Sequence, residues 1–176
     1  MKDYFNPDIE GFMTEACLQW LFKTAQTMDS ILEIGSHYGR STHALLSGCR
    51  GQVIAVDPWQ DTTREGKPRQ QVFQQFLKNV SRFPNLGIMR MPSIAAARFF
   101  RDQSFDMVFI DGNHAYEHVK ADNEAWLPKT RKLICGHDFS KNWPGVVQAV
   151  EELYPDRYEL VGGRCSIWVV RLDARP

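Results

Sequence analysis

The sequence contains no apolar run long enough to span a bilayer and no excess of charge of either sign. Lysine and arginine together number 21, as do aspartate and glutamate, so the formal net charge is zero. A dedicated binder of nucleic acid or of an anionic membrane normally carries a basic excess, so we expect neither partner. The first residues lack the charged-then-apolar layout of a signal peptide, and cytoplasmic residence is therefore our default expectation.

Cysteine is also scarce, and its spacing gives no metal or redox motif. The four cysteines are Cys17, Cys49, Cys135 and Cys165, and no two of them form a CxxC pair. All four stand in apolar contexts or at the ends of expected elements. Scattered reduced thiols are more typical of a cytosolic protein than of a disulfide framework. We therefore expect four reduced cysteines that fill the core.

Apolar strand-like segments alternate with helix-like segments along most of the chain. We expect strands at 31–35, 52–57, 86–91, 105–111 and 132–137. Helices are expected at 14–28, capped by Thr14, and at 39–46, 70–81, 93–101, 116–127 and 145–154, with Ser93 as an N-cap. Residues 61–69 are polar and indicate a loop. Two closing strands, 158–161 and 166–172, flank a Gly-Gly hairpin signal.

This alternation predicts an α/β fold with a mostly parallel sheet and helices on both faces. The closing hairpin adds one parallel and one antiparallel strand at the edge, giving seven strands in all. With 176 residues, we expect a single domain over 1–176, in which the helix at 14–28 forms a partial cover. In such folds the ligand lies outside the carboxyl ends of the strands, where strand order reverses.

The loop after the first strand reads Glu33-Ile-Gly35-Ser-His-Tyr-Gly39-Arg-Ser41. Its two glycines permit a tight turn and a close backbone approach to a ligand. The third glycine of a dinucleotide-binding loop is missing, which makes a nicotinamide oxidoreductase the least favoured function. Glu33 either lies near a cationic ligand group or braces the loop.

Asp57 ends the second strand, 22 residues after Gly35. A carboxylate at this point can accept hydrogen bonds from both ribose hydroxyls of a nucleoside. The alternative is a turn residue before Pro58.

A second group of polar residues follows the fourth and fifth strands. Asp111 ends one of these strands, His114 follows it, and His137 and Asp138 end the other. Because neighbouring parallel strands end at the same edge, we expect these side chains to converge on one crevice. They could hold a divalent metal, and imidazole adds affinity for later transition metals. The alternatives are a turn formed by Asp111 and Gly112, and a role for Asp138 as the cap of the following segment.

Three segments resemble a known family. ILEIGSHYGRST resembles motif I of the class I S-adenosylmethionine-dependent methyltransferases, especially the small catechol-type O-methyltransferases. FIDGNHAYEHVKADNEAWLP, followed by GHDF, resembles the short bacterial branch called methyltransferase family 24. The similarity extends from about Gly11 to the C-terminus and implies a Rossmann-like fold.

The resemblance implies S-adenosylmethionine as the cofactor and a set of contacts at matching positions. The methionine part would meet the strand end and turn, and the ribose would meet Asp57. Pro58 or Trp59 would lie against the adenine and Ser93 at its edge, while Trp59 has the alternative of packing over the core. The cofactor positions are Glu33, Gly35, Ser36, His37, Tyr38, Gly39, Ser41, Asp57, Pro58, Trp59, Ser93 and Asp111.

The resemblance also implies a metal site. Catechol-type enzymes place one ligand where Asp111 stands and an Asp-Asn pair where His137-Asp138 stands. Because histidine stands in place of the first aspartate, the identity of the metal as magnesium is in doubt. Manganese or another divalent ion is the alternative. Such a metal would lower the pKa of an acceptor oxygen. Without it, His114 or His137 would act as the general base.

We therefore expect a methyltransferase acting at an oxygen of a small molecule. Acceptor choice would fall to residues 1–13, 59–70 and 140–146, where Trp143 either lines the pocket or packs on the hairpin. Two alternatives stay open: a non-catalytic S-adenosylmethionine- or S-adenosylhomocysteine-binding or interaction protein, and a metal-dependent hydrolase or hydroxylase-like relative. A homodimer is also left open.

Overall fold

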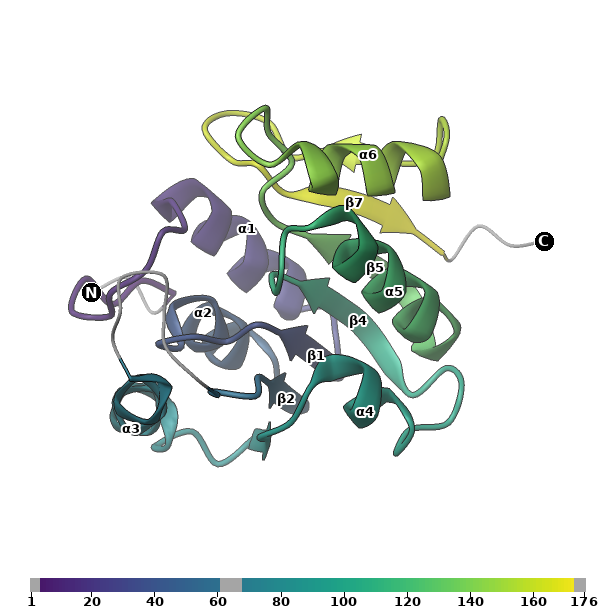
Figure 1. Cartoon of the computed structure of the whole chain (residues 1–176). Helices are drawn as coiled ribbons and strands as arrows, with labels where there is room; N and C mark the ends of the chain where they lie inside the picture. The colour runs from purple at the N-terminus through teal and green to yellow at the C-terminus, as the bar shows by residue number, and fades with distance from the viewer. Residues whose placement is uncertain (1–3, 61–67, 173–176) are drawn as a thin grey trace.

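The chain folds into a seven-stranded sheet between two layers of helices (Figure 1). The computed structural model describes residues 4–60 and 68–172. The strands are β1 (Ser30–Ile34), β2 (Gln52–Val56), β3 (Leu86–Met89), β4 (Phe105–Ile110), β5 (Thr130–Gly136), β6 (Glu159–Leu160) and β7 (Trp168–Arg171). The helices are α1 (Glu15–Ala25), α2 (Arg40–Gly48), α3 (Arg69–Val80), α4 (Ser93–Ala97), α5 (Tyr116–Trp126) and α6 (Pro144–Leu153), with a 3-10 turn η1 (Leu127–Lys129).

The strand order is β3-β2-β1-β4-β5-β7-β6. Strands β1 to β5 are parallel, β7 is antiparallel to β5, and β6 is antiparallel to β7. The predicted α/β fold with a mostly parallel sheet is confirmed, with the antiparallel strand lying between β5 and the edge strand β6. The order reverses between β1 and β4, so the ligand crevice of this topology opens where these two strands end.

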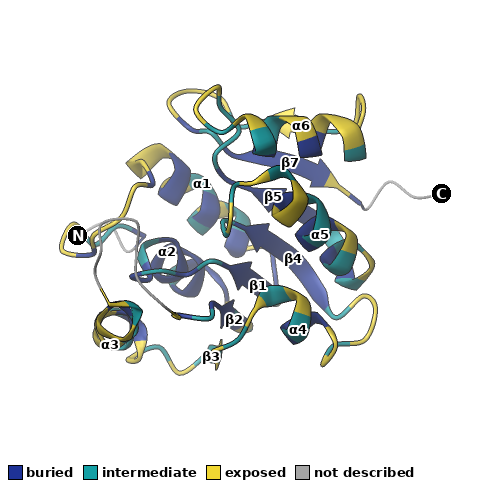
Figure 2. Cartoon of the chain, viewed as in Figure 1, coloured by how far each residue is buried: buried dark blue, intermediate teal, exposed yellow. Residues whose placement is uncertain are grey.

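Two hydrophobic cores lie on opposite faces of the sheet. Alternate strand residues such as Ile31 and Met107 pack with apolar residues of α1, α2 and α3. Their neighbours in the sequence, Leu32 and Val108, pack with α4, α5 and α6. All six residues of β4 are buried. Figure 2 shows the central strands in dark blue, and exposed residues on the outer sides of α3, α5 and α6. The two-residue period of a strand thus supplies both cores.

The helix ends follow the sequence in part. The predicted cap of α1 is confirmed, because the Thr14 side chain accepts a hydrogen bond from the Cys17 N–H. Helix α4 is shorter than predicted and its N-cap is Pro92, so the prediction of Ser93 as a cap is wrong. His43 in α2 is buried and contacts Phe83, with their ring centroids 5.3 Å apart.

No helix within the described residues is long and apolar enough to cross a membrane. Of the polar loop predicted at 61–69, residues 61–67 lie outside the described part of the chain, and Arg69 already belongs to α3.

Candidate functional site

The turn between β1 and α2 depends on two glycines. Gly35 has φ +85°, and a Cβ atom built there would lie 2.0 Å from the backbone oxygen of Asp111. Gly39 has φ +87°, forms the N-cap of α2, and donates its N–H to the Ser36 oxygen at 2.7 Å. L-residues with side chains rarely adopt such φ values. Glycine at position 35 therefore brings the loops after β1 and β4 into direct backbone contact.

Glu33 lies fully buried in β1, and its carboxylate braces the turn. It accepts hydrogen bonds from the hydroxyls of Ser36 at 2.7 Å, of Ser41 at 2.5 Å, and of Thr42. Burial raises the pKa of Glu33 to about 7, because it disfavours the charged form more than the three hydroxyls favour it. Of the two roles expected for Glu33, the structure shows the bracing of the loop. The bracing is made through side-chain hydroxyls, and one of them belongs to Thr42, which the sequence did not single out.

Asp57 joins the turn after β1 to the loop after β2. Its Oδ2 accepts a hydrogen bond from the His37 N–H at 3.1 Å, and its Oδ1 accepts one from the Trp59 N–H at 2.8 Å. The residue is buried at the carboxyl end of β2. Asp57 therefore does more than begin a turn before Pro58, because it fixes the relative positions of two loops at the crevice.

Trp59 folds inward over the core. Its side chain is 1% exposed, and its ring centroid lies 4.8 Å from those of both Phe73 and Phe76 in α3. The indole N–H donates to the His37 oxygen at 3.0 Å. Of the two positions expected for Trp59, the structure has the packed one. Pro58, in contrast, is half-buried.

Ser93 lies at the start of α4, and its hydroxyl donates to the Asp122 carboxylate of α5. Asp122 is buried, and burial raises its pKa, an effect that the Ser93 hydroxyl partly opposes. Ser93 is thus placed after β3 as the sequence predicts, and it ties α4 to α5.

Asp111, His114, His137 and Asp138 come together at the carboxyl ends of β4 and β5. Nε2 of His114 lies 2.8 Å from Oδ2 of Asp138 and 3.8 Å from Oδ1 of Asp111. Nδ1 of His137 lies 3.3 Å from Oδ1 of Asp138 and 3.7 Å from Oδ1 of Asp111. The nearby Asn113 side chain is engaged within its own turn, where its Oδ1 accepts a hydrogen bond from the Ala115 N–H. The predicted convergence of the four side chains is therefore present.

The charges gathered in this cluster shift the pKa of His114, His137 and Asp138. Burial lowers the pKa of both histidines, but the carboxylates of Asp111 and Asp138 outweigh it and raise the pKa of His114 to about 9 and of His137 to about 10. Burial alone would raise the pKa of Asp138, yet the imidazoles hold it well below its ordinary value. The raised pKa favours the protonated form of both histidines at neutral pH, a form that cannot accept a proton.

The donor set fits a divalent metal. Ligand atoms of Asp111, His114 and Asp138 all lie within 4.8 Å of one another. Within the described residues, buried Nε2 of His114 makes no hydrogen bond of normal geometry, although Oδ2 of Asp138 is 2.8 Å away. Carboxylate oxygens and an imidazole nitrogen gathered at one place are a common ligand set for a divalent ion. This group contains His114 together with the predicted ligands Asp111 and Asp138, while Nδ1 of the predicted ligand His137 faces the same two carboxylates.

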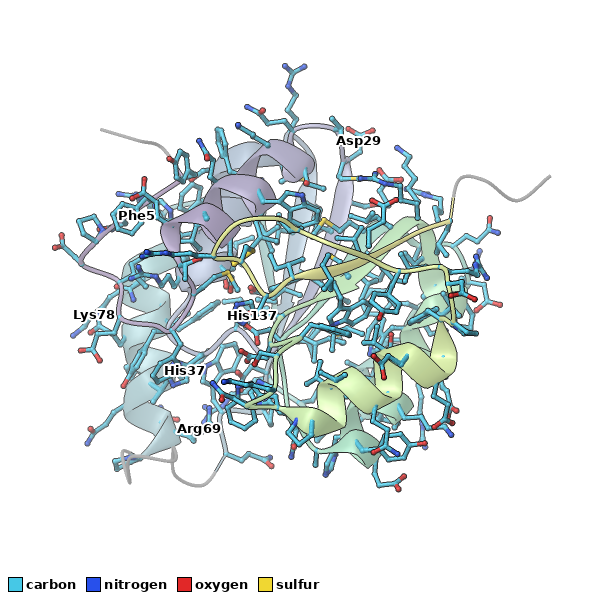
Figure 3. All side chains as sticks on the ribbon, turned by 90° about the horizontal axis from the view of Figure 1, so that it is seen from above. Phe5, Asp29, His37, Arg69, Lys78 and His137 are labelled. Carbon is cyan, nitrogen blue, oxygen red and sulfur yellow. A yellow bond between two sulfur atoms is a disulfide. The ribbon has the colours of Figure 1, made fainter. Side chains whose placement is uncertain are left out.

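Two features of the site are missing from the sequence-based prediction. Cys17 in α1 and Cys165 before β7 form a disulfide, so the expectation of four reduced thiols is wrong for this pair and holds for Cys49 and Cys135. Cys17 Sγ lies 3.9 Å from Nε2 of His137. The second feature is Ser166, whose hydroxyl lies 3.1 Å from the same nitrogen. These contacts place α1 and the segment before β7 beside His137, which Figure 3 labels together with His37.

A family profile described as "Methyltransferase domain" matches residues 32–139 of the chain. This segment runs from β1 through β5 and includes both the glycine turn and the Asp111–Asp138 cluster. The chain therefore belongs to this methyltransferase family, and its fold is that of the class I S-adenosylmethionine-dependent methyltransferases.

The chain is also similar to the uncharacterized protein y4gI of Sinorhizobium fredii. The two are 30% identical over 116 residues, which is 61% of this chain and 13% of that protein. The chain thus spans a small part of the curated relative that it matches.

Solved structures share the fold at low identity. A protein of Corynebacterium glutamicum has a TM-score of 0.70 and 14% identity, with 94% of this chain and 84% of that chain covered. An O-methyltransferase from Bacillus cereus in complex with S-adenosylhomocysteine has a TM-score of 0.61 and 19% identity, at 94% and 84% coverage. The N-methyltransferase NodS from Bradyrhizobium japonicum, with the same ligand, has a TM-score of 0.57 and 13% identity, at 87% and 83% coverage. The fold therefore leaves the acceptor atom open.

Proposed function

We propose that this protein transfers a methyl group from S-adenosylmethionine to an oxygen atom of a small molecule, with the help of a divalent metal. One observation carries the proposal. The glycine turn with Asp57 and the Asp111–Asp138 cluster lie at the same edge of the sheet, and they meet where Gly35 contacts the backbone of Asp111. A methyl donor and an acceptor-activating group must be adjacent for in-line transfer, because this reaction depends mainly on positioning.

The cofactor would lie along the turn and its neighbouring loop. We propose that Gly35, Ser36, His37, Tyr38, Gly39 and Ser41 contact the methionine part. Each carboxylate oxygen of Asp57 accepts one backbone N–H. Since such an oxygen has two lone pairs, both can still accept a ribose hydroxyl. Pro58 is better placed than Trp59 to lie against the adenine, because the Trp59 ring is packed against α3.

The metal would be held by Asp111, His114 and Asp138, with Nδ1 of His137, which faces the same two carboxylates, as a fourth donor. When bound, a divalent ion supplies Lewis acidity that lowers the pKa of an acceptor hydroxyl. Two imidazoles next to two carboxylates favour Mn²⁺ or a later transition metal over Mg²⁺. Because the free histidines are protonated, metal uptake should release protons and strengthen as pH rises.

The same cluster favours oxygen over nitrogen as the acceptor atom. An amine that has lost its proton already carries a nucleophilic lone pair, whereas a hydroxyl must be deprotonated before it can attack. The raised pKa values of His114 and His137 make either imidazole a poor base for that step. Activation of a hydroxyl would therefore depend on the metal, whereas an amine would need no metal site. Trp143 would form one wall of the acceptor pocket, since its ring centroid lies 4.1 Å from that of His114.

Calorimetric titration with S-adenosylmethionine, with and without Mn²⁺, tests the proposal. We expect micromolar binding, about −8 kcal/mol, to the wild type and its loss in Asp57→Ala. Asp102→Ala is the matched control, because Asp102 is an exposed carboxylate away from the crevice that pairs with Lys129. Thermal unfolding checks that both variants fold. Absence of binding to the wild type under every metal condition would overturn the proposal in favour of a metal-dependent relative or an interaction protein.

A further inference from the structure

His137 is the most buried member of the cluster, and its two ring nitrogens face different partners. Nδ1 faces the carboxylates, 3.3 Å from Asp138 Oδ1 and 3.7 Å from Asp111 Oδ1. Nε2 faces away from them, 3.1 Å from the hydroxyl oxygen of Ser166. The ring has this orientation in a side chain that is only 7% exposed. A ring flip would turn carbon atoms toward both partners. The contact at Nε2 therefore helps to decide whether a nitrogen or a carbon atom of the ring faces Asp111 and Asp138.

Ser166 is itself held in place from both sides. Its backbone oxygen accepts a hydrogen bond from the N–H of Phe139, the residue after Asp138, at 2.9 Å. The preceding residue, Cys165, is joined by the disulfide to Cys17 in α1. Thr14 adds a further link, donating its hydroxyl to the Arg164 oxygen at 3.1 Å. The Ser166 hydroxyl therefore meets His137 from a segment fixed to α1 and to the loop after β5.

We propose that Ser166 is a positioning residue, whose hydroxyl oxygen accepts a hydrogen bond from Nε2–H of His137 and keeps Nδ1 directed at Asp111 and Asp138. A histidine nitrogen can present a lone pair to a cation only when the other nitrogen carries the proton, and a fixed acceptor for that proton selects the orientation. The proposal rests on the proposed function only for the role of the cluster, because the hydrogen bond itself exists without any ligand.

The test uses the full chain with Ser166→Ala, which removes the acceptor, and Ser166→Thr, which keeps a hydroxyl on the same carbon. Ser104→Ala is the control, because Ser104 is distant and its hydroxyl donates to the Arg101 oxygen. Nitrogen-15 NMR of the histidine rings in the metal-free protein is the first readout. We expect a protected Nε2–H signal from His137 in the wild type, Ser166→Thr and Ser104→Ala, and its loss in Ser166→Ala.

Titration with Mn²⁺ is the second readout. Removal of such an outer partner typically weakens metal binding about 10- to 100-fold, so we expect that loss in Ser166→Ala and a change below about threefold in Ser166→Thr. An unchanged His137 signal in a folded Ser166→Ala protein would overturn the positioning role, whatever the metal affinity. If the wild type bound no Mn²⁺, the metal part of the proposed function would fail, and the NMR comparison would still decide the role of Ser166.

Discussion

Glu33 shows how one buried carboxylate links the cofactor turn to stability. Its pKa is raised from 4.5 to about 7 by burial, so between these values the folded protein binds a proton that the unfolded chain has released. Stability contributed by this group is therefore lost as pH rises through that window. A rise in pKa of this size corresponds to about 3 kcal/mol.

Glu33→Gln should remove this pH dependence, because glutamine stays neutral. We expect the free energy of unfolding of the wild type, relative to the variant, to fall by about 3 kcal/mol between pH 4.5 and 7 and then to level off. Urea unfolding at several pH values measures it, and the subtraction cancels the other titrating groups. Parallel curves for the two proteins would show that folding does not raise the pKa of Glu33.

Gly35 is the second residue on which the site depends. Alanine there combines an unfavourable positive φ with a Cβ 2.0 Å from the Asp111 oxygen. We expect Gly35→Ala to destabilise the protein by about 2–4 kcal/mol and to abolish S-adenosylmethionine binding. Gly162→Ala is the control, since a Cβ at Gly162 meets nothing within 4 Å. Equal stability of the two variants would contradict the close contact between the loops.

Among the elements, α1 and the C-terminal hairpin are joined by the Cys17–Cys165 disulfide, which links residues 148 positions apart. Loss of a native disulfide typically costs about 2–5 kcal/mol. We expect a reductant to lower the melting temperature of the wild type and to leave the double variant Cys17→Ala/Cys165→Ala unaffected. Alkylation of the denatured, unreduced wild type should modify two cysteines. Modification of all four would show that the bond is absent.

The order of the elements was predictable because each strand or helix carries its own local signal. The apolar run Phe105–Ile110 can be recognised as a buried strand, and the glycine at position 35 as part of a turn, without reference to the rest of the chain. Contacts between distant segments carry no such signal. Neither the Cys17–Cys165 pair nor the approach of Ser166 to His137 leaves a spacing motif, because both arise only when the hairpin pairs with β5.

The position of an individual side chain was predictable only where the order of the strands left one possible environment for it. Asp111, His137 and Asp138 converge because neighbouring strands must end at one edge. Trp59 had two suitable environments, and the outcome depended on Phe73 and Phe76, which lie on a helix that the loop precedes.

At the scale of the whole molecule, a ligand that binds only the folded chain must stabilise it. S-adenosylmethionine at 100 times its dissociation constant should add about 2.7 kcal/mol to the free energy of unfolding. Because the proposed site is formed by the loops after four strands of one sheet (β1, β2, β4 and β5), we expect the whole thermal transition to shift as one cooperative step. Unchanged melting at saturating cofactor would contradict the proposed site.

The most direct measurement is a crystal structure of the protein with S-adenosylhomocysteine and Mn²⁺. We expect the ligand to lie across the turn from Gly35 to Gly39 with its ribose hydroxyls on Asp57, and the metal between Asp111, His114 and Asp138. Electron density for the ligand at any other place, or an empty crevice at saturating ligand, would contradict the assignment of this crevice to methyl transfer.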